Sequence, residues 1–252
     1  MPIKTLSIPT VDGRADAFAA LPDSAGQHPE ALPGVLMYGD AFGDRPVLRE
    51  LAQELAGHGY YVLVPNFFYR TGPAPVIELS EHIGDAARDE AIGKLMPLIQ
   101  AHTDERIVRD AESCLEFLTA QPEVRPGPVA VTGYCIGGLL AVRTASAFPD
   151  RVAAVAGFHG PVGADEPDSL HRLLSRITAE LHLGHAETDL TPEALGELNQ
   201  ALDAAGVRYT SEIYPGTVHG YTMSDTDAFS PAGLQRHWDR LLPLLERTLG
   251  DG

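Results

Sequence analysis

Short apolar runs alternate with amphipathic segments along most of this chain. Near the middle of the chain the apolar runs are hydrophobic on both faces, as strands of a buried parallel sheet must be. Between these runs, leucines recur at helical spacing. Residues 46–60 are an example, and the glycines near their end indicate the end of a helix. The alternation predicts βαβ units and a mostly parallel sheet flanked by helices. The expected strands are 6–10, 14–22, 33–39, 60–66, 127–134, 151–160, 177–187 and 207–216, and the expected helices are 46–60, 105–121, 136–148, 191–206 and 231–249.

The first two strands are expected to form a hairpin around Asp12-Gly13, which is a turn-forming pair. The chain shows no internal repeat and no linker that would divide it, so residues 1–252 are interpreted as one α/β domain. One region interrupts the alternation, at about residues 69–104, where prolines, glycines and scattered charges occur together. We expect a loop-and-helix excursion there, and such excursions often border a functional site.

The composition of the chain limits the kinds of molecule that it is expected to bind. The 252 residues are 44% hydrophobic, which is enough for a sizeable core, and the formal net charge is −17. A surface this acidic repels nucleic acid and anionic lipid, so neither is an expected partner. The N-terminal residues lack the basic and apolar pattern of a signal peptide, no apolar run reaches membrane-spanning length, and two cysteines make no disulfide framework. We therefore expect a cytoplasmic protein.

The segment "VAVTGYCIGG" is the most informative stretch of the sequence. It contains G-x-C-x-G, with Cys135 between Gly133 and Gly137, and it joins an expected strand to an expected helix. A nucleophile elbow needs a tight turn at this place, because the turn lifts the nucleophile above the sheet. The N-terminus of the following helix favours a thiolate, and the N–H of Ile136 is placed to bind an oxyanion. Cys135 is therefore our candidate nucleophile.

The other cysteine has a different setting. Cys114 lies within a helical pattern beside Leu115 and Leu118, with no neighbouring glycine. We expect it to be a core residue.

A cysteine nucleophile needs a base and an acid that orients the base. In α/β hydrolases the chain order is nucleophile, acid, histidine. His219 lies in the glycine-rich loop after the last expected strand, which makes it the candidate base. The acid should follow the preceding strand, where Glu187 and Asp189 are available. We favour Glu187, with Asp189 as the alternative, since Asp189 could instead cap the helix that starts near Pro192.

A metal site is the competing interpretation of the same residues. Its ligands would be His182, His185, Glu187, Asp189 and His219, but His182 and His185 do not have a standard metal-ligand spacing. We expect no metal and no cofactor.

Taken together, these motifs resemble the dienelactone hydrolase family of the α/β-hydrolase superfamily, from "PGVLMYGDAFGDRP" to "YPGTVHGY". The cysteine in "GYCIGG" is the most specific part, since most α/β hydrolases use serine. The resemblance implies an α/β-hydrolase fold and a carboxylate beside the nucleophile, which maps onto Asp40 in "GDAFG". It also implies that Asp40 tunes the cysteine and that the N–H of Ala41 is the second oxyanion donor. Members of the family bind a substrate carboxylate with arginines, for which Arg88 is the candidate here.

The sequence therefore predicts hydrolysis of a small-molecule ester or lactone through a cysteine acyl-enzyme. Two alternatives remain. Glutamine amidotransferases share G-x-C-x-G, but they place a glutamate close after the histidine, and no His-Pro-Glu occurs here. The second alternative is a degenerate member of the family, which binds a small ligand without turning it over. Asp40 and Glu187 permit this alternative, because both differ in length from the family's carboxylates.

Overall fold

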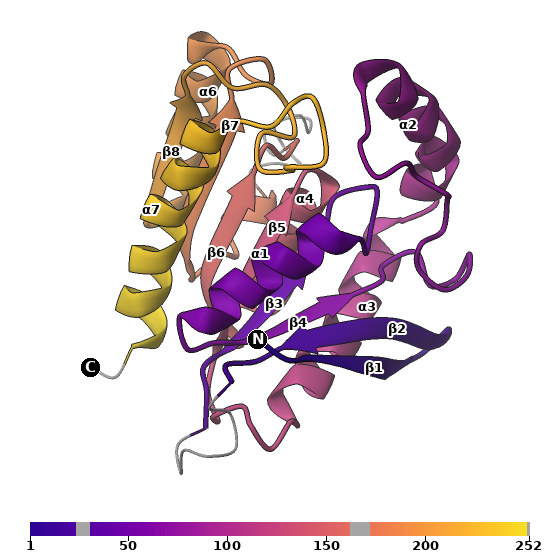
Figure 1. The fold of residues 1–252 in the computed structure, drawn as a ribbon. Coiled ribbons are helices and arrows are strands. Elements are labelled where there is room, and N and C mark those ends of the chain that lie inside the picture. Colours follow the sequence, from indigo (N-terminus) through magenta and orange to yellow (C-terminus); the bar gives the residue numbers. More distant parts are fainter. Residues whose placement is uncertain (24–30, 162–171, 251–252) are drawn as a thin grey trace.

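A computed structural model describes residues 1–23, 31–161 and 172–250. Eight strands form one sheet in the order β1-β2-β4-β3-β5-β6-β7-β8 (Figure 1). β1 and β2 pair antiparallel, as do β2 and β4, and every other pair is parallel. The strands are β1 (Ile3–Thr10), β2 (Gly13–Ala20), β3 (Gly34–Tyr38), β4 (Tyr61–Pro65), β5 (Val129–Tyr134), β6 (Val152–Phe158), β7 (Glu180–Ala186) and β8 (Tyr209–Tyr214). The predicted mostly parallel sheet is confirmed.

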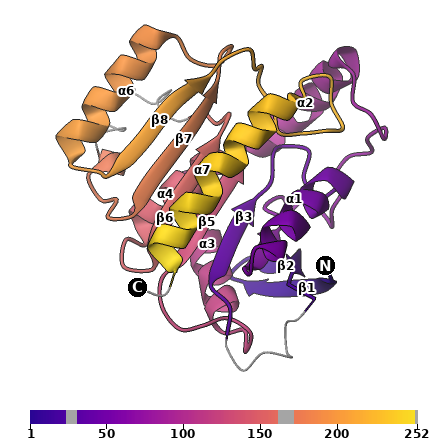
Figure 2. The ribbon, with the colours of Figure 1, turned by 60° about the vertical axis from the view of Figure 1, so that its left-hand side comes forward.

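Helices cover both faces of the sheet (Figure 2). They are α1 (Pro46–Gly57), α2 (Asp85–Gln100), α3 (Asp104–Thr119), α4 (Ile136–Ala147), α6 (Pro192–Ala205) and α7 (Pro231–Leu249). α1 and α7 pack on one face, and the residues of α3, α4 and α6 join the core on the other. Every residue of β3, β4 and β5 is buried, because helices shield both of their faces. With all eight strands in one sheet, we keep the prediction of a single domain.

Local sequence signals account for both ends of α6. Thr191 caps α6 by accepting a hydrogen bond from the N–H of Ala194, and Pro192 is the first residue of the helix, where proline is favoured. Gly206 ends the same helix in the left-handed conformation, at φ 70°. These signals place the loop between β7 and α6, and with it the carboxylates that follow β7.

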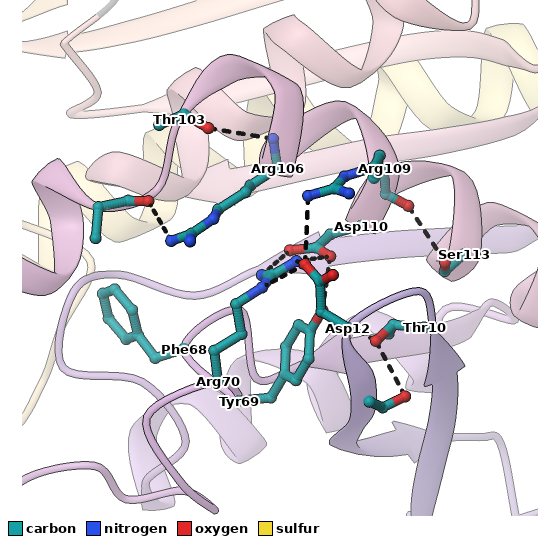
Figure 3. Close-up of polar contacts among 12 residues, drawn as sticks. Thr10, Asp12, Phe68, Tyr69, Arg70, Thr103, Arg106, Arg109, Asp110 and Ser113 are labelled. Atoms are coloured by element: carbon teal, nitrogen blue, oxygen red, sulfur yellow. Dashed lines mark hydrogen bonds and ion pairs between the residues drawn. The ribbon is translucent and has the colours of Figure 1, made fainter.

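The excursion is anchored at its start and loosely packed at its end. Arg70 bridges the hairpin to α3, because its guanidinium lies 2.7 Å from both Asp12 and Asp110, and Tyr69 donates to Asp110 at 2.9 Å (Figure 3). α2 follows and buries only Ala91 and Leu95. Figure 1 shows it standing apart from the helices that cover the sheet. The region at about residues 69–104 contains α2 as its helix.

Three buried histidines make the stability of the fold sensitive to acid. Burial lowers the pKa of His182 and His185 to about 4 and that of His237 to about 3. Below pH 6.5 the unfolded chain therefore binds protons at these rings and the folded chain does not. Stability is present above pH 6.5 and falls as the pH drops toward 4, by about 1.4 kcal/mol per pH unit for each histidine.

We expect His237→Asn to reduce the slope of unfolding free energy against pH between 6.5 and 4, because one titrating ring is removed. Denaturant unfolding at a series of pH values measures this slope. His58→Asn is the matched control, since it removes a histidine whose side chain is 45% exposed and so separates the loss of a buried ring from the loss of any histidine. An unaltered slope in His237→Asn would contradict the prediction.

Candidate active site

Cys135 occupies the turn between β5 and α4 in a strained conformation, with φ 54° and ψ −124°. Few non-glycine residues adopt positive φ, and those that do are concentrated at functional sites. Two main-chain hydrogen bonds hold the turn: Cys135 N–H donates to the carbonyl of Phe158 at 3.0 Å, and Gly138 N–H donates to the carbonyl of Cys135 at 3.0 Å. The turn therefore has the backbone geometry of a nucleophile elbow, with Cys135 at its tip.

The glycines of G-x-C-x-G are required by close main-chain contacts. A Cβ at Gly133 would lie 2.0 Å from the carbonyl oxygen of Gly137, and a Cβ at Gly137 would lie 2.4 Å from that of Gly39. No side chain fits at either position unless the backbone moves. The spacing that the sequence shows thus has a direct steric cause.

His219 faces both the cysteine and a carboxylate. Its loop follows β8, and its Nδ1 lies 2.8 Å from Asp189 Oδ2. The His219 N–H donates to the hydroxyl of Thr188 at 3.1 Å, which ties this loop to the turn after β7. The Cys135 thiol and the imidazole of His219 are neighbours, since both residues line one cavity and the thiol helps to raise the pKa of the imidazole. The structure therefore brings Cys135, His219 and Asp189 together at one site.

The preference for Glu187 as the orienting acid is wrong in this geometry. The carboxylate of Glu187 accepts a hydrogen bond from the N–H of Gly216, at the start of the loop that carries His219. Asp189 is held in the turn after β7, where its N–H donates to the carbonyl of Ala186 at 3.0 Å. Asp189 does not cap α6 either, because Thr191 does. The turn aims the shorter side chain at His219 and leaves the longer one to support the loop.

The contacts of His219 determine its charge. Burial lowers the pKa of its ring, but the hydrogen bonds and negative charges of Asp189 and Cys135 outweigh burial and raise it to about 10. These contacts stabilise the protonated ring, and a protonated His219 can donate a proton to a leaving group.

Asp40 lies in the expected place but binds a different partner. Its two carboxylate oxygens lie 2.6 and 2.9 Å from the guanidinium of Arg45, which also binds Asp225 at 2.6 Å. Asp40 and Arg45 are both buried, so the pair is shielded from water. The resemblance implied that Asp40 tunes Cys135 directly. In the described part of the chain, however, no contact joins the two side chains. The role of Arg45 could not be predicted from the sequence, because it depends on Asp225, which is 180 residues away along the chain.

A small cavity of about 30 Å³ connects these residues. It is lined by Asp40, Ala41, Phe42, Arg88, Ile92, Cys135, His159, His219, Gly220 and Thr226. Arg88 reaches it from α2 and donates to the carbonyl oxygen of His219 at 3.3 Å. The main-chain N–H groups of Ala41 and Ile136 have no hydrogen-bond acceptor among the described residues. A volume near 30 Å³ holds about one or two water molecules, so the cavity is small.

The histidines of the metal interpretation are engaged elsewhere. His182 lies between Thr210 and Tyr214, at 2.6 and 3.0 Å, and His185 contacts Ser211 at 3.3 Å. Neither is among the residues that line the cavity. The structure therefore does not bring the predicted ligand set together.

Among the cavity residues that the sequence analysis did not single out, His159 is the one with a titratable side chain. His159 directly follows β6, beside the elbow. The available signal was its position, since sites in parallel sheets gather at the carboxyl ends of the strands.

The fold and the site define an α/β hydrolase with a cysteine elbow. The sequence profile of the dienelactone hydrolase family matches residues 15–249, and the chain belongs to that family. It is accordingly a hydrolase of the ester and lactone class.

Individual relatives agree with this assignment. Carboxymethylenebutenolidase 1 of Cupriavidus pinatubonensis is 30% identical over 92% of both chains. A Klebsiella pneumoniae protein, provisionally named a dienelactone hydrolase, has a TM-score of 0.82 at 19% identity and 98% coverage of both chains. A dienelactone hydrolase-like promiscuous phosphotriesterase from metagenomic libraries has a TM-score of 0.75 at 20% identity, covering 98% of this chain and 99% of its own. The two structural likenesses concern the fold alone.

No helix in the described ranges combines the length and the apolar character that crossing a membrane needs.

Proposed function

We propose that the protein hydrolyses a small carboxylic ester or lactone through an acyl-thioenzyme on Cys135. The observation that carries the proposal is the arrangement of a strained Cys135 in the same cavity as His219, whose ring is hydrogen-bonded to Asp189. A nucleophile, a base and an orienting acid in this order are the requirements of covalent acyl transfer. Its relatives' names, such as carboxymethylenebutenolidase, point to the same chemistry.

In the proposed first step, the Cys135 thiolate attacks the carbonyl carbon, and the carbonyl π electrons move to oxygen. The N–H groups of Ala41 and Ile136, which lack other acceptors among the described residues, bind this oxyanion. When the oxyanion collapses, the C–O bond to the alkoxide breaks. The imidazolium of His219 gives the leaving oxygen its proton. A thioester and a neutral His219 remain.

In the second step, neutral His219 takes a proton from a water molecule as that water attacks the thioester. Asp189 stabilises the imidazolium that forms and fixes the orientation of the ring through Nδ1. The C–S bond then breaks, which releases the carboxylic acid and restores the thiolate–imidazolium pair.

The cavity is far smaller than an ester, so we propose that the site widens when substrate binds. α2 is the element we propose to move, because it buries only Ala91 and Leu95 and contacts the site through Arg88. Arg88 would then bind a negatively charged group of the substrate, in keeping with its place in the cavity. Cytoplasmic localisation stays a prediction.

The alternative of a non-catalytic binding protein had two grounds, the lengths of the carboxylates at positions 40 and 187. The second is weakened, because the carboxylate against His219 is an aspartate, Asp189. No separate observation favours this alternative.

The acyl-enzyme can be trapped. The protein is mixed with p-nitrophenyl acetate, quenched in acid within milliseconds to seconds and digested for peptide mass spectrometry. We expect acetylation of Cys135 at early times, decaying as p-nitrophenol continues to be released, with Cys114 unmodified in the same sample. Release of p-nitrophenol without any acetyl-Cys135 would contradict the covalent mechanism, and absence of both would contradict the proposed function.

A further inference from the structure

Backbone strain marks two residues of the cavity. In the described ranges, Cys135 and His159 are the only non-glycine residues with positive φ, at 54° and 39°. Both line the cavity, although they belong to different strand ends. Such strain persists only where the surrounding structure enforces it, and it is typical of functional sites. The strain at Cys135 is explained by the elbow, whereas the proposed mechanism gives His159 no task.

The surroundings of His159 hold its ring firmly. The residue is fully buried, and its N–H donates to the carbonyl of Gly184 at 2.8 Å. Its ring stands edge-on to those of His219 and Tyr221, with ring centres 5.2 and 5.0 Å away. Nε2 lies 2.8 Å from the hydroxyl of Thr222, which is itself fully buried.

The ring of His159 is uncharged. Burial, followed by the charge of His219, lowers its pKa well below the usual range. A contact with its own main chain acts in the opposite sense without reversing the shift. A neutral imidazole carries one proton, and the hydrogen bond to Thr222 decides which nitrogen bears it.

The proton belongs on Nδ1. No other partner of the Thr222 hydroxyl is present among the described residues, so the hydroxyl proton must go to Nε2. If Nε2 carried a proton instead, both the hydroxyl proton and the Nδ1 lone pair would be unpaired in a buried setting. The Nδ1–H tautomer leaves only one group unpaired and is therefore favoured.

That one unpaired group belongs to a residue that lines the cavity. His159 Nδ1 is buried, and no other residue in the part of the chain that the structure describes offers it a hydrogen-bond partner. Five other buried side-chain atoms share this property, in Tyr61, Arg109, Thr132, Asn199 and His237, but none of those residues lines the cavity. An unsatisfied donor beside the nucleophile is relieved when a bound molecule offers an acceptor.

We propose that His159 determines specificity by donating a hydrogen bond from Nδ1 to an oxygen of the substrate other than the carbonyl oxygen under attack. The preferred substrates are then esters or lactones with a second acceptor oxygen close to the acyl carbon. A site built to bind such an oxygen discriminates against an analogue that lacks it, because the donor stays buried and unpaired. This inference rests on the proposed hydrolase function.

Two esters of equal length test the proposal. p-Nitrophenyl methoxyacetate and p-nitrophenyl butanoate differ by an oxygen in place of a methylene group in the acyl chain. The ratio of their kcat/KM values is measured in the wild-type protein and in His159→Phe, so that the difference in intrinsic reactivity cancels. We expect the ratio to fall by at least about fivefold in His159→Phe.

His159→Asn is the matched variant. Asparagine tolerates positive φ and keeps an N–H donor, so it should retain more of the wild-type ratio than phenylalanine does. Thermal unfolding of both variants shows whether they are folded. An unchanged ratio in folded His159→Phe would overturn the proposal.

A second measurement does not depend on any variant. Long-range ¹H–¹⁵N NMR of the imidazole distinguishes the two neutral tautomers, and we expect the Nδ1–H form for His159. The Nε2–H form would overturn the proposal. If the wild-type protein hydrolysed neither ester, the proposed function would fail, whereas hydrolysis of both with an unaltered ratio would remove only the role of His159.

Discussion

Replacing Cys135 with alanine is expected to lower kcat/KM for p-nitrophenyl acetate by about 1,000-fold or more. The variant lacks the only side chain in the cavity that we assign as nucleophile, and the oxyanion donors alone give limited catalysis. Folding should be little affected, since Cys135 lies at the cavity and is partly exposed. Initial rates of p-nitrophenol release measure the effect.

Cys114→Ala is the matched control, because it removes the other thiol of the chain. Cys114 is buried in the core, where burial raises the pKa of its thiol well above the usual range. Its replacement should cost stability but leave kcat/KM close to the wild-type value. Iodoacetamide at pH 6–7 gives an independent comparison, with selective alkylation of Cys135 expected. Activity that survives in Cys135→Ala would refute the assignment of the nucleophile.

The second large effect concerns the acid. We expect Asp189→Asn to lower kcat by roughly 100- to 10,000-fold, because an amide cannot stabilise the imidazolium of His219 and can favour the wrong tautomer. The contact that is lost is the 2.8 Å hydrogen bond to His219 Nδ1. Steady-state kinetics with p-nitrophenyl acetate, together with thermal unfolding, separate this effect from a loss of folded protein.

Glu187→Gln is the discriminating variant. The glutamine oxygen can still accept the hydrogen bond from the N–H of Gly216, so the His219 loop should keep its position. We therefore expect near-wild-type kinetics. A larger loss in Glu187→Gln than in Asp189→Asn would restore Glu187 as the orienting acid.

The ion cluster around Arg45 gives Asp40 a different part from the one that the family resemblance implies. Arg45 holds both oxygens of Asp40 and also binds Asp225, so the carboxylate is neutralised where it borders the cavity. Arg45 and Asp225 also line a larger hollow of about 840 Å³ outside the cavity. The cluster is thus part of the wall between the two spaces. A fixed wall of this kind can help to position a substrate without touching the thiol.

The sequence by itself determined the elements and the order of the site along the chain. The alternation of apolar runs and helical patterns required a layered α/β fold, because each pattern buries one kind of face. G-x-C-x-G between a strand and a helix fixed the elbow, because only glycine fits the main-chain contacts at Gly133 and Gly137. The loop between the last strand and the last helix was enough to single out His219.

The tertiary structure alone decided which side chains meet. Glu187 and Asp189 stand two residues apart, and only the course of the turn after β7 determines that Asp189 reaches His219. Asp40 forms an ion pair with Arg45, which also binds Asp225, and the sequence alone does not indicate these ion pairs. His159 gained a position beside Cys135 because β5 and β6 are neighbours in the sheet. Local patterns fix backbone conformation over a few residues, whereas the direction and reach of a side chain depend on elements far away in the sequence.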